Sequence, residues 1–275
     1  MASTSRPPRP VGEVRVWAVR QAPPWPEDLV LSLLDVRERA RAASLTHPRD
    51  RSMYLAAHVG LRLLLGERLG VHPRDLRFAR DRCAHCGGPN GRPILLTGPY
   101  GQGAPGGPYF SLSHCAGITL IGLADVLVGV DVERLPSRRT VELCLARLHP
   151  RERAELLRVR RAERPLEFCR LWTRKEAYLK ALGTGLSRGL DRDYLGAGGE
   201  GRPVGWSVVN LSCGPQDRTH AAALAVPRWV RAPAGPGELN WSAYGHVLGG
   251  VGSLNEQGVR SVVRAAEVDM PTVRD

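Results

Sequence analysis

Carboxylates and amines gather in two short segments of this 275-residue chain. In the first, Gly129-Val130-Asp131-Val132-Glu133, the acids alternate with valines, so on a β-strand both carboxylates lie on one face with Cα atoms about 6.6 Å apart. This separation lets Asp131 and Glu133 converge on one divalent ion, and Gly129 leaves room for a ligand. Two carboxylates together with phosphate oxygens and water suit Mg²⁺ far better than zinc. The alternative is a solvated strand end without a ligand.

The second segment, residues 168–186, holds the only two lysines among 39 Lys and Arg residues. Lys175 and Lys180 flank Glu176, whereas every other cationic position carries arginine. An ammonium is a compact point donor suited to phosphate, and a guanidinium is a planar fork. We therefore infer that both lysines are retained here by chemistry that suits an ammonium. The simpler interpretation is an exposed helix, in which Glu176 and Lys180 form an ordinary i, i+4 pair worth about 0.3 kcal/mol.

Both segments need regular structure to hold them in place. Phe168, Leu171, Leu179 and Leu182 recur at helical spacing, which predicts a helix that Gly183 ends. Strands are predicted over residues 13–19, 118–124, 127–132, 204–211 and 219–226. Further helices are predicted over residues 27–44, over residues 51–69 with Asp50 as the N-cap, and over residues 138–161.

The net charge limits the kinds of partner that the protein is expected to bind. A formal net charge of +12 implies an acidic partner or a polyphosphate ligand. A nucleic-acid-binding protein is the alternative from another class, but the chain has no recognition motif and only 5% aromatic residues for base stacking. No apolar run approaches the ~18 residues of a membrane span, and the first ten residues lack the apolar core of a secretory signal. We therefore expect no membrane partner and a cytoplasmic location, which six cysteines without framework spacing also favour.

Cys83 and Cys86 form a C-x-x-C pair that is compatible with a zinc site. A structural zinc needs four ligands, and a partner C-x-x-C or H-x-x-H is missing. His72, His85 or a distant cysteine would have to complete the set. The alternative, which the sequence favours, is a loop with free thiols.

Several motifs together resemble one enzyme family, the 4′-phosphopantetheinyl transferases. The pattern W-x-x-K-E-A-x-x-K over residues 172–180 and Gly-Val-Asp-Val-Glu over residues 129–133 are similar to two signatures of that family. The segment 109–115 resembles its F-N-x-S-H-S stretch, with Ser111 where asparagine is usual and Cys115 where serine is usual. Gly91-Arg92-Pro93 resembles its G-[KR]-P turn, which lies beside the adenine-binding region in relatives.

The resemblance implies a fold and a division of the chain. It implies the larger, monomeric Sfp type, an α+β protein in which two similar α+β halves form a pseudodimer with the active site in the cleft between them. The expected division is a disordered N-terminus over 1–12, an N-terminal half over 13–125, a C-terminal half over 126–227 and an extension over 228–275.

The resemblance also implies a reaction. It implies Mg²⁺-dependent transfer of the 4′-phosphopantetheine group of coenzyme A to a serine of an apo acyl or peptidyl carrier protein, with release of 3′,5′-ADP. The arginine-rich segment 138–161 is either a docking face for an acidic carrier protein or an ordinary solvated face. A relative that binds coenzyme A without transferring is the alternative within the family.

The family's functional residues carry over to particular positions in this chain. Asp131, Glu133 and Glu176 are implied as metal ligands, and Glu176 is also the candidate base for the serine proton. Lys180 is implied to assist the leaving group. The expected contacts to coenzyme A come from Arg51, Arg92, Ser113, His114, Lys175 and Lys180.

Overall fold

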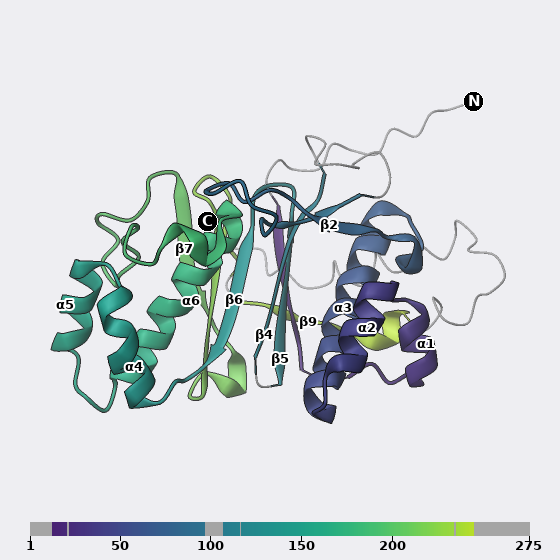
Figure 1. Cartoon of the computed structure of the whole chain (residues 1–275), viewed down its shortest axis with the longest axis horizontal. Helices are drawn as coiled ribbons and strands as arrows, with labels where there is room; N and C mark the ends of the chain where they lie inside the picture. The colour runs from purple at the N-terminus through teal and green to yellow at the C-terminus, as the bar shows by residue number, and fades with distance from the viewer. Residues whose placement is uncertain (1–12, 21, 97–106, 116, 234, 245–275) are drawn as a thin grey trace, which may run out of the picture.

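The structure, a computed structural model, describes residues 13–20, 22–96, 107–115, 117–233 and 235–244. It is a mixed α/β fold in four layers, with two sheets in the middle and helices on both outer sides (Figure 1). Helices α1 to α3 cover the sheet of the N-terminal half, and α4 to α6 cover the sheet of the C-terminal half. Among the residues described, no helix has the length and apolar character needed to cross a membrane.

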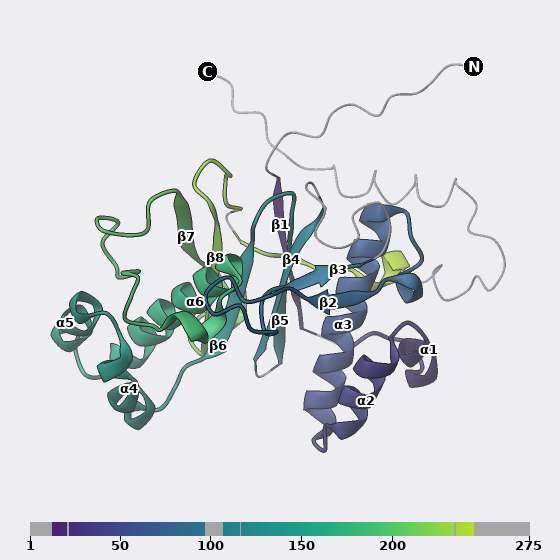
Figure 2. The same ribbon diagram turned by 45° about the horizontal axis from the view of Figure 1, so that its top comes forward.

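The N-terminal half places its long helix against a sheet in the order β4-β5-β1-β9. Its strands are β1 Val14–Val19, β4 Tyr109–Cys115, β5 Ile118–Ala124 and the short β9 Gly237–Glu238. Its helices are α1 Glu27–Ser32, α2 Val36–Ser44 and α3 Pro48–Leu69, and a separate hairpin pairs β2 Phe78–Arg80 with β3 Pro93–Leu95 (Figure 2).

The helices of this half differ from their predicted bounds at two capping residues. The single helix expected over 27–44 is two helices, because Asp35 interrupts the first and caps α2 through a capping box with Glu38. Helix α3 begins at Pro48 rather than after Asp50, since proline at the first helical position has no N–H to leave unpaired.

The C-terminal half has its own three-stranded sheet and three helices. Its sheet runs β6-β8-β7, with β6 Gly129–Arg134, β7 Trp206–Leu211 and β8 His220–Pro227. Its helices are α4 Arg138–Cys144, α5 Pro150–Arg158 and α6 Arg164–Leu182. Each half therefore reads strand, long helix, strand, strand, and in each the last of these strands lies in the middle of the three.

A core between the two sheets holds the halves together. Strand β8 alternates between the two layers of core: Leu224 and Val226 face the other sheet, whereas Ala223 and Ala225 face the helices. Val130 of β6 packs in the layer between the sheets. This layer fixes the orientation of β6, the strand that carries the two predicted acids.

Side chains of β4 complete the edge of β6. The backbone N–H groups of Val130 and Val132 donate to Ser111 Oγ and Ser113 Oγ at 3.0 and 3.3 Å. The N–H of Arg134 donates to Cys115 Sγ at 3.2 Å. A row of side chains therefore takes the place of a backbone ladder where the two sheets meet, and we call this row the β4–β6 seam.

The described part of the expected C-terminal extension belongs to the N-terminal half. Strand β9 pairs in parallel with β1, and the buried Tyr244 joins the core under α3, where its hydroxyl donates to Glu67 at 2.7 Å. This packing places residues 237–244 in the fold itself. The expected disorder of residues 1–12 and the rest of the extension, 245–275, lie outside the described residues.

Candidate active site

Strand β6 carries Asp131 into the interior beside helix α6. Gly129 allows the close crossing of the two elements, since a Cβ there would lie 1.9 Å from the carbonyl oxygen of Ala177. Gly129 therefore makes room for the α6 backbone rather than for a ligand, which corrects the expectation from the sequence. Asp131 itself is only 2% exposed, so neighbouring groups fix the position of its carboxylate.

The two oxygens of the Asp131 carboxylate have different surroundings. Oδ1 accepts hydrogen bonds from Ser113 Oγ at 2.8 Å and from Lys180 Nζ at 2.6 Å. Oδ2 is buried and has no hydrogen-bond partner among the described residues. Because a buried carboxylate oxygen without a donor is unfavourable, Oδ2 is a position that a cation would stabilise.

Glu133 and Glu176 share the electrostatic field of Asp131. Burial and the charge of Asp131 raise the pKa of Glu176 to about 7, with a further contribution from Glu133, against the opposing charge of Lys180. Burial and Asp131 also raise the pKa of Glu133. The three predicted acids therefore lie close enough to repel one another, and a bound cation would relieve this repulsion.

These residues fit a divalent cation by their chemistry. In the described part of the chain, no three His, Cys, Asp or Glu side chains already surround one metal position. The fit comes instead from the unpartnered Oδ2 of Asp131 and from the repulsion among the acids. Mg²⁺ usually keeps water and phosphate oxygens as ligands and takes only one or two carboxylates, so such a sparse donor set suits it.

Lys180 is the lysine that meets the acids. It lies one turn before the end of α6, where Gly183 adopts a φ of 74° and caps the helix. Its Nζ donates to Asp131 Oδ1 and, at 3.3 Å, to the carbonyl oxygen of Val130. Since 30% of the side chain remains exposed, the ammonium can also reach an anion from solvent.

Lys175 has a different role from the one expected from the sequence. Its side chain is 2% exposed, and Nζ lies 2.7 Å from Glu152, a fully buried carboxylate on α5. Nζ also donates to the carbonyl oxygen of Asp193 at 2.6 Å. A phosphate contact needs an accessible ammonium, so the structure assigns Lys175 to an internal ion pair between α6 and α5.

Ser113 lies beside the acids, but its hydroxyl proton is already donated in a hydrogen bond. A hydroxyl has one proton to donate, and Ser113 gives it to Asp131 while accepting the N–H of Val132. This arrangement positions a carboxylate and a strand, and leaves no donor for the expected contact to coenzyme A.

His114, the next residue on β4, is exposed and lies in a basic field. Desolvation lowers the pKa of its imidazole, and the charges of His58, Lys180 and Arg41 lower it further. His58 is itself held at 3.0 Å by Glu38. The predicted contact of His114 with a coenzyme A phosphate stays a prediction, with Arg41 and His58 in its surroundings.

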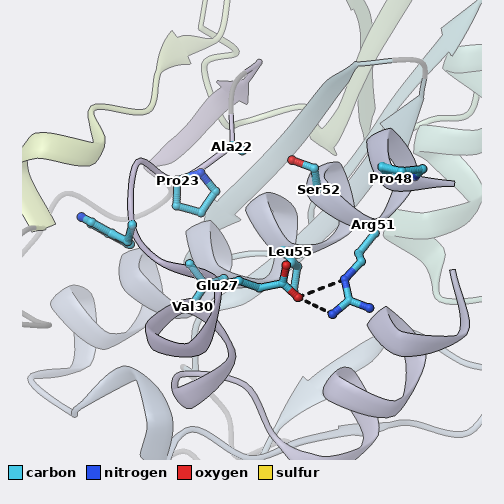
Figure 3. Close-up of a pocket in the computed structure, with 9 residues that line it drawn as sticks. Ala22, Pro23, Glu27, Val30, Pro48, Arg51, Ser52 and Leu55 are labelled. Atoms are coloured by element: carbon cyan, nitrogen blue, oxygen red, sulfur yellow. Dashed lines mark hydrogen bonds and ion pairs between the residues drawn. The ribbon is translucent and has the colours of Figure 1, made fainter. Parts of the chain in front are cut away.

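Arg51 lies on the first turn of α3 and is already paired. Its guanidinium contacts Glu27 through Nε at 3.1 Å and through a second nitrogen (Figure 3). The pair borders a cavity of about 240 Å³ whose apolar wall includes Val30 and Leu55. The structure does not bring Arg51 to the acids of β6 and α6, so its contact with the 3′-phosphate also stays a prediction.

Arg92 follows the hairpin turn and faces β4. Its guanidinium lies 5.6 Å from the centre of the Tyr109 ring, and Nε is 3.8 Å from Asp81. The Nη1 nitrogen is buried and has no hydrogen-bond partner among the described residues. Arg92 therefore has a donor to spare beside a cavity of about 90 Å³ that reaches Ala181 of α6, and its adenine-side contact stays a prediction.

Two structurally important residues were not identified from the sequence. Glu152 stands in an arginine-rich helix that reads as a solvated face, yet its carboxylate pairs with Lys175 and accepts the N–H of Leu195 at 2.6 Å. Ser111 was noted only as a departure from a motif, although it holds β6 at the seam. The one available signal was the capping pattern of α5, in which Glu152 stands three residues after His149.

Comparison with known proteins identifies the family of this site. Residues 127–203, which include both acid-bearing elements, match the profile of the 4′-phosphopantetheinyl transferase superfamily. The 4′-phosphopantetheinyl transferase HetI of Nostoc sp. is 32% identical over 180 residues, which make up 64% of this chain and 71% of that protein. The 4′-phosphopantetheinyl transferase ffp of Bacillus subtilis is 26% identical over 167 residues, or 60% and 66% of the two chains.

A Synechocystis sp. relative from the same group of transferases is 32% identical over 163 residues, which are 58% of this chain and 61% of that relative. The matched region thus spans about three fifths of that protein's length. The profile match covers strand β6, the three acids and helix α6. By these matches, the chain belongs to the 4′-phosphopantetheinyl transferase superfamily.

Proposed function

We propose that this protein transfers the 4′-phosphopantetheine group of coenzyme A to a serine of an apo acyl or peptidyl carrier protein and releases 3′,5′-ADP. The observation that carries the proposal is the group formed by Asp131, Glu133 and Glu176 with Lys180 in contact with Asp131. Membership of the superfamily and the names of HetI and ffp support the same reaction.

Mg²⁺ is the cation that we propose for the acids. Asp131, Glu133 and Glu176 would hold it, and it would supply positive charge to the diphosphate of coenzyme A. The unpartnered Oδ2 of Asp131 supports this choice. Ser113 and the β4–β6 seam keep Asp131 in one orientation, which lowers the reorganisation needed when the charged substrate binds.

The chain's own residues would carry the chemical step as follows. The serine Oγ of the carrier protein attacks the β-phosphorus of coenzyme A, and the bond from that phosphorus to the oxygen of 3′,5′-ADP breaks. Glu176, which lies in the field of Asp131 and Glu133, accepts the serine proton. Lys180 lies beside Asp131 with its ammonium part-exposed and neutralises charge that develops on the phosphate oxygens.

We further propose a pseudodimer of two similar halves that acts as a monomer in the cytoplasm, with coenzyme A between the halves. The shared order of elements supports this arrangement, and so does the position of His114 on β4 in the field of Lys180 on α6. The net charge of +12 supports acidic carrier proteins as partners.

Intact-mass analysis tests the proposed reaction. Several apo carrier proteins are incubated with coenzyme A, Mg²⁺ and the protein, and a mass gain of one phosphopantetheine on serine is expected for at least one of them. Glu176→Gln and Asp131→Ala should abolish the gain while the circular dichroism spectrum stays native. Near-normal transfer by either variant would remove that residue from its proposed role, and no transfer to any carrier would refute the proposal.

A further inference from the structure

A second group of reactive side chains lies outside the acid site, in the turn that contains Cys83 and Cys86. The turn is closed by two backbone hydrogen bonds, from the Gly87 N–H to the Cys83 carbonyl at 2.8 Å and from the Cys83 N–H to the Gly88 carbonyl at 2.7 Å. Gly87 has a φ of 70°, a conformation that glycine adopts without strain. The turn buries Cys83 and leaves Cys86 exposed.

The Cys83 sulfur contacts several polar groups. Ser187 Oγ lies 3.1 Å from Sγ, and the backbone N–H groups of Cys86 and His85 also point to it. These contacts, together with the Cys86 thiol, lower the pKa of Cys83 to about 7. The two sulfurs are thus in hydrogen-bonding contact, and Cys83 has thiolate character at neutral pH.

The other buried cysteines have the opposite surroundings. Burial raises the pKa of Cys169 to about 12 and that of Cys213 to about 11. Such thiols are protonated at neutral pH and react slowly with disulfides. In the C-x-x-C turn, by contrast, a thiol with a lowered pKa, Cys83, lies next to an exposed thiol, Cys86.

We propose that Cys83 and Cys86 form a dithiol–disulfide site that is oxidised reversibly by exchange with a low-molecular-weight disulfide. The exposed Cys86 loses its proton to solvent and attacks one sulfur of the small disulfide, whose S–S bond breaks and releases one thiolate, which takes up a proton. Cys83 then attacks Cys86 Sγ, forms the Cys83–Cys86 bond and releases the second thiolate, which takes up a proton. Two protein thiols and one small disulfide become one protein disulfide and two small thiols, so atoms and electrons balance.

The same geometry disfavours zinc, the other interpretation of this motif. A structural zinc site needs four ligands, and in the described ranges no third His, Cys, Asp or Glu joins the two cysteines at a common metal position. The turn instead docks on the end of α6, where the Ala84 N–H donates to the carbonyl of Gly183 at 3.4 Å and the protonated form of Cys83 donates to that of Thr184 at 3.5 Å. The turn therefore contacts the C-terminal end of the helix that carries Lys180.

Thiol labelling across glutathione redox buffers tests the proposal on the full chain. After equilibration, remaining thiols are blocked with N-ethylmaleimide and the peptides are mapped by mass spectrometry. Cys83 and Cys86 are expected to lose the label together as oxidised glutathione increases and to regain it with dithiothreitol. In Cys86→Ser, at an exposed position, Cys83 should keep its label, and the matched variant Cys144→Ser should behave like the unsubstituted protein.

Three outcomes would overturn the proposal. The first is full labelling of Cys83 and Cys86 at every glutathione ratio, and the second is pairing of either with another cysteine. The third is one tightly held zinc ion per chain that protects both thiols in the reduced protein. Because labelling does not depend on transfer to a carrier, this test stands apart from the test of the proposed function.

Discussion

The two lysines of α6 should respond to substitution in opposite ways. Lys175→Ala removes the ammonium that faces Glu152, whose side chain is fully buried. An unpaired charge in such a place costs about 3–5 kcal/mol of unfolding free energy, so urea unfolding should show a large loss. In the double variant Lys175→Met/Glu152→Gln neither side chain is charged, so most of the lost unfolding free energy should be recovered.

Lys180→Ala should instead reduce activity far more than stability, because its ammonium is part-exposed and meets Asp131 at the acid site. We expect a transfer rate lower by about 10²–10³-fold, as for other single groups that stabilise developing charge. Lys180→Arg keeps the positive charge but places it on a planar guanidinium, so its transfer rate should lie between those of Lys180→Ala and the unsubstituted protein. The reasoning is refuted if Lys175→Ala unfolds at the normal urea concentration yet cannot transfer, since Lys175 would then act on substrate.

Three further predictions concern Gly129, Glu176 and Tyr244. Gly129→Ala should lower the unfolding free energy, measured by urea unfolding, by about 3 kcal/mol or more, because its Cβ would lie 1.9 Å from the Ala177 carbonyl oxygen. The control Gly199→Ala places its Cβ in open space and should leave the unfolding free energy unchanged. Without a divalent ion, Glu176 binds its proton more tightly in the folded state, with a pKa of about 7 against 4.5, so stability falls as pH rises through this range. Mg²⁺ should therefore raise the melting temperature more at pH 8 than at pH 5. An equal rise at both pH values would contradict the assignment of Glu176 as a metal ligand. Tyr244→Ala should lose about 3–5 kcal/mol by urea unfolding, since the ring is buried under α3, and a neutral result would show that residues 237–244 are not part of the core.

The elements of this fold were predictable wherever the hydrophobic pattern was local. The alternation in Val14–Val19 and the apolar run in Ile118–Ala124 gave strands close to their observed bounds. The return of residues 237–244 to the first sheet was not predictable, because β9 is only two residues long and its pairing with β1 depends on contacts distant in the sequence.

The candidate site shows the same limit at the level of single residues. The family resemblance grouped Asp131, Glu176 and Lys180, and in the structure Lys180 contacts Asp131, whose charge also acts on Glu176. The prediction for Lys175 was wrong, because adjacent side chains on a helix point about 100° apart. Lys175 therefore points away from the acid site, and its ammonium pairs with a buried carboxylate on α5.

The β4–β6 seam has a consequence for attempts to divide the protein. Because hydroxyl and thiol groups of one half occupy the N–H groups of Val130, Val132 and Arg134, a fragment that begins at β6 would present a bare strand edge. Such an edge readily recruits strands from other molecules and leads to aggregation. A fragment containing both signature motifs would thus retain every acid and Lys180, yet we expect it to precipitate unless residues 109–115 are supplied in trans.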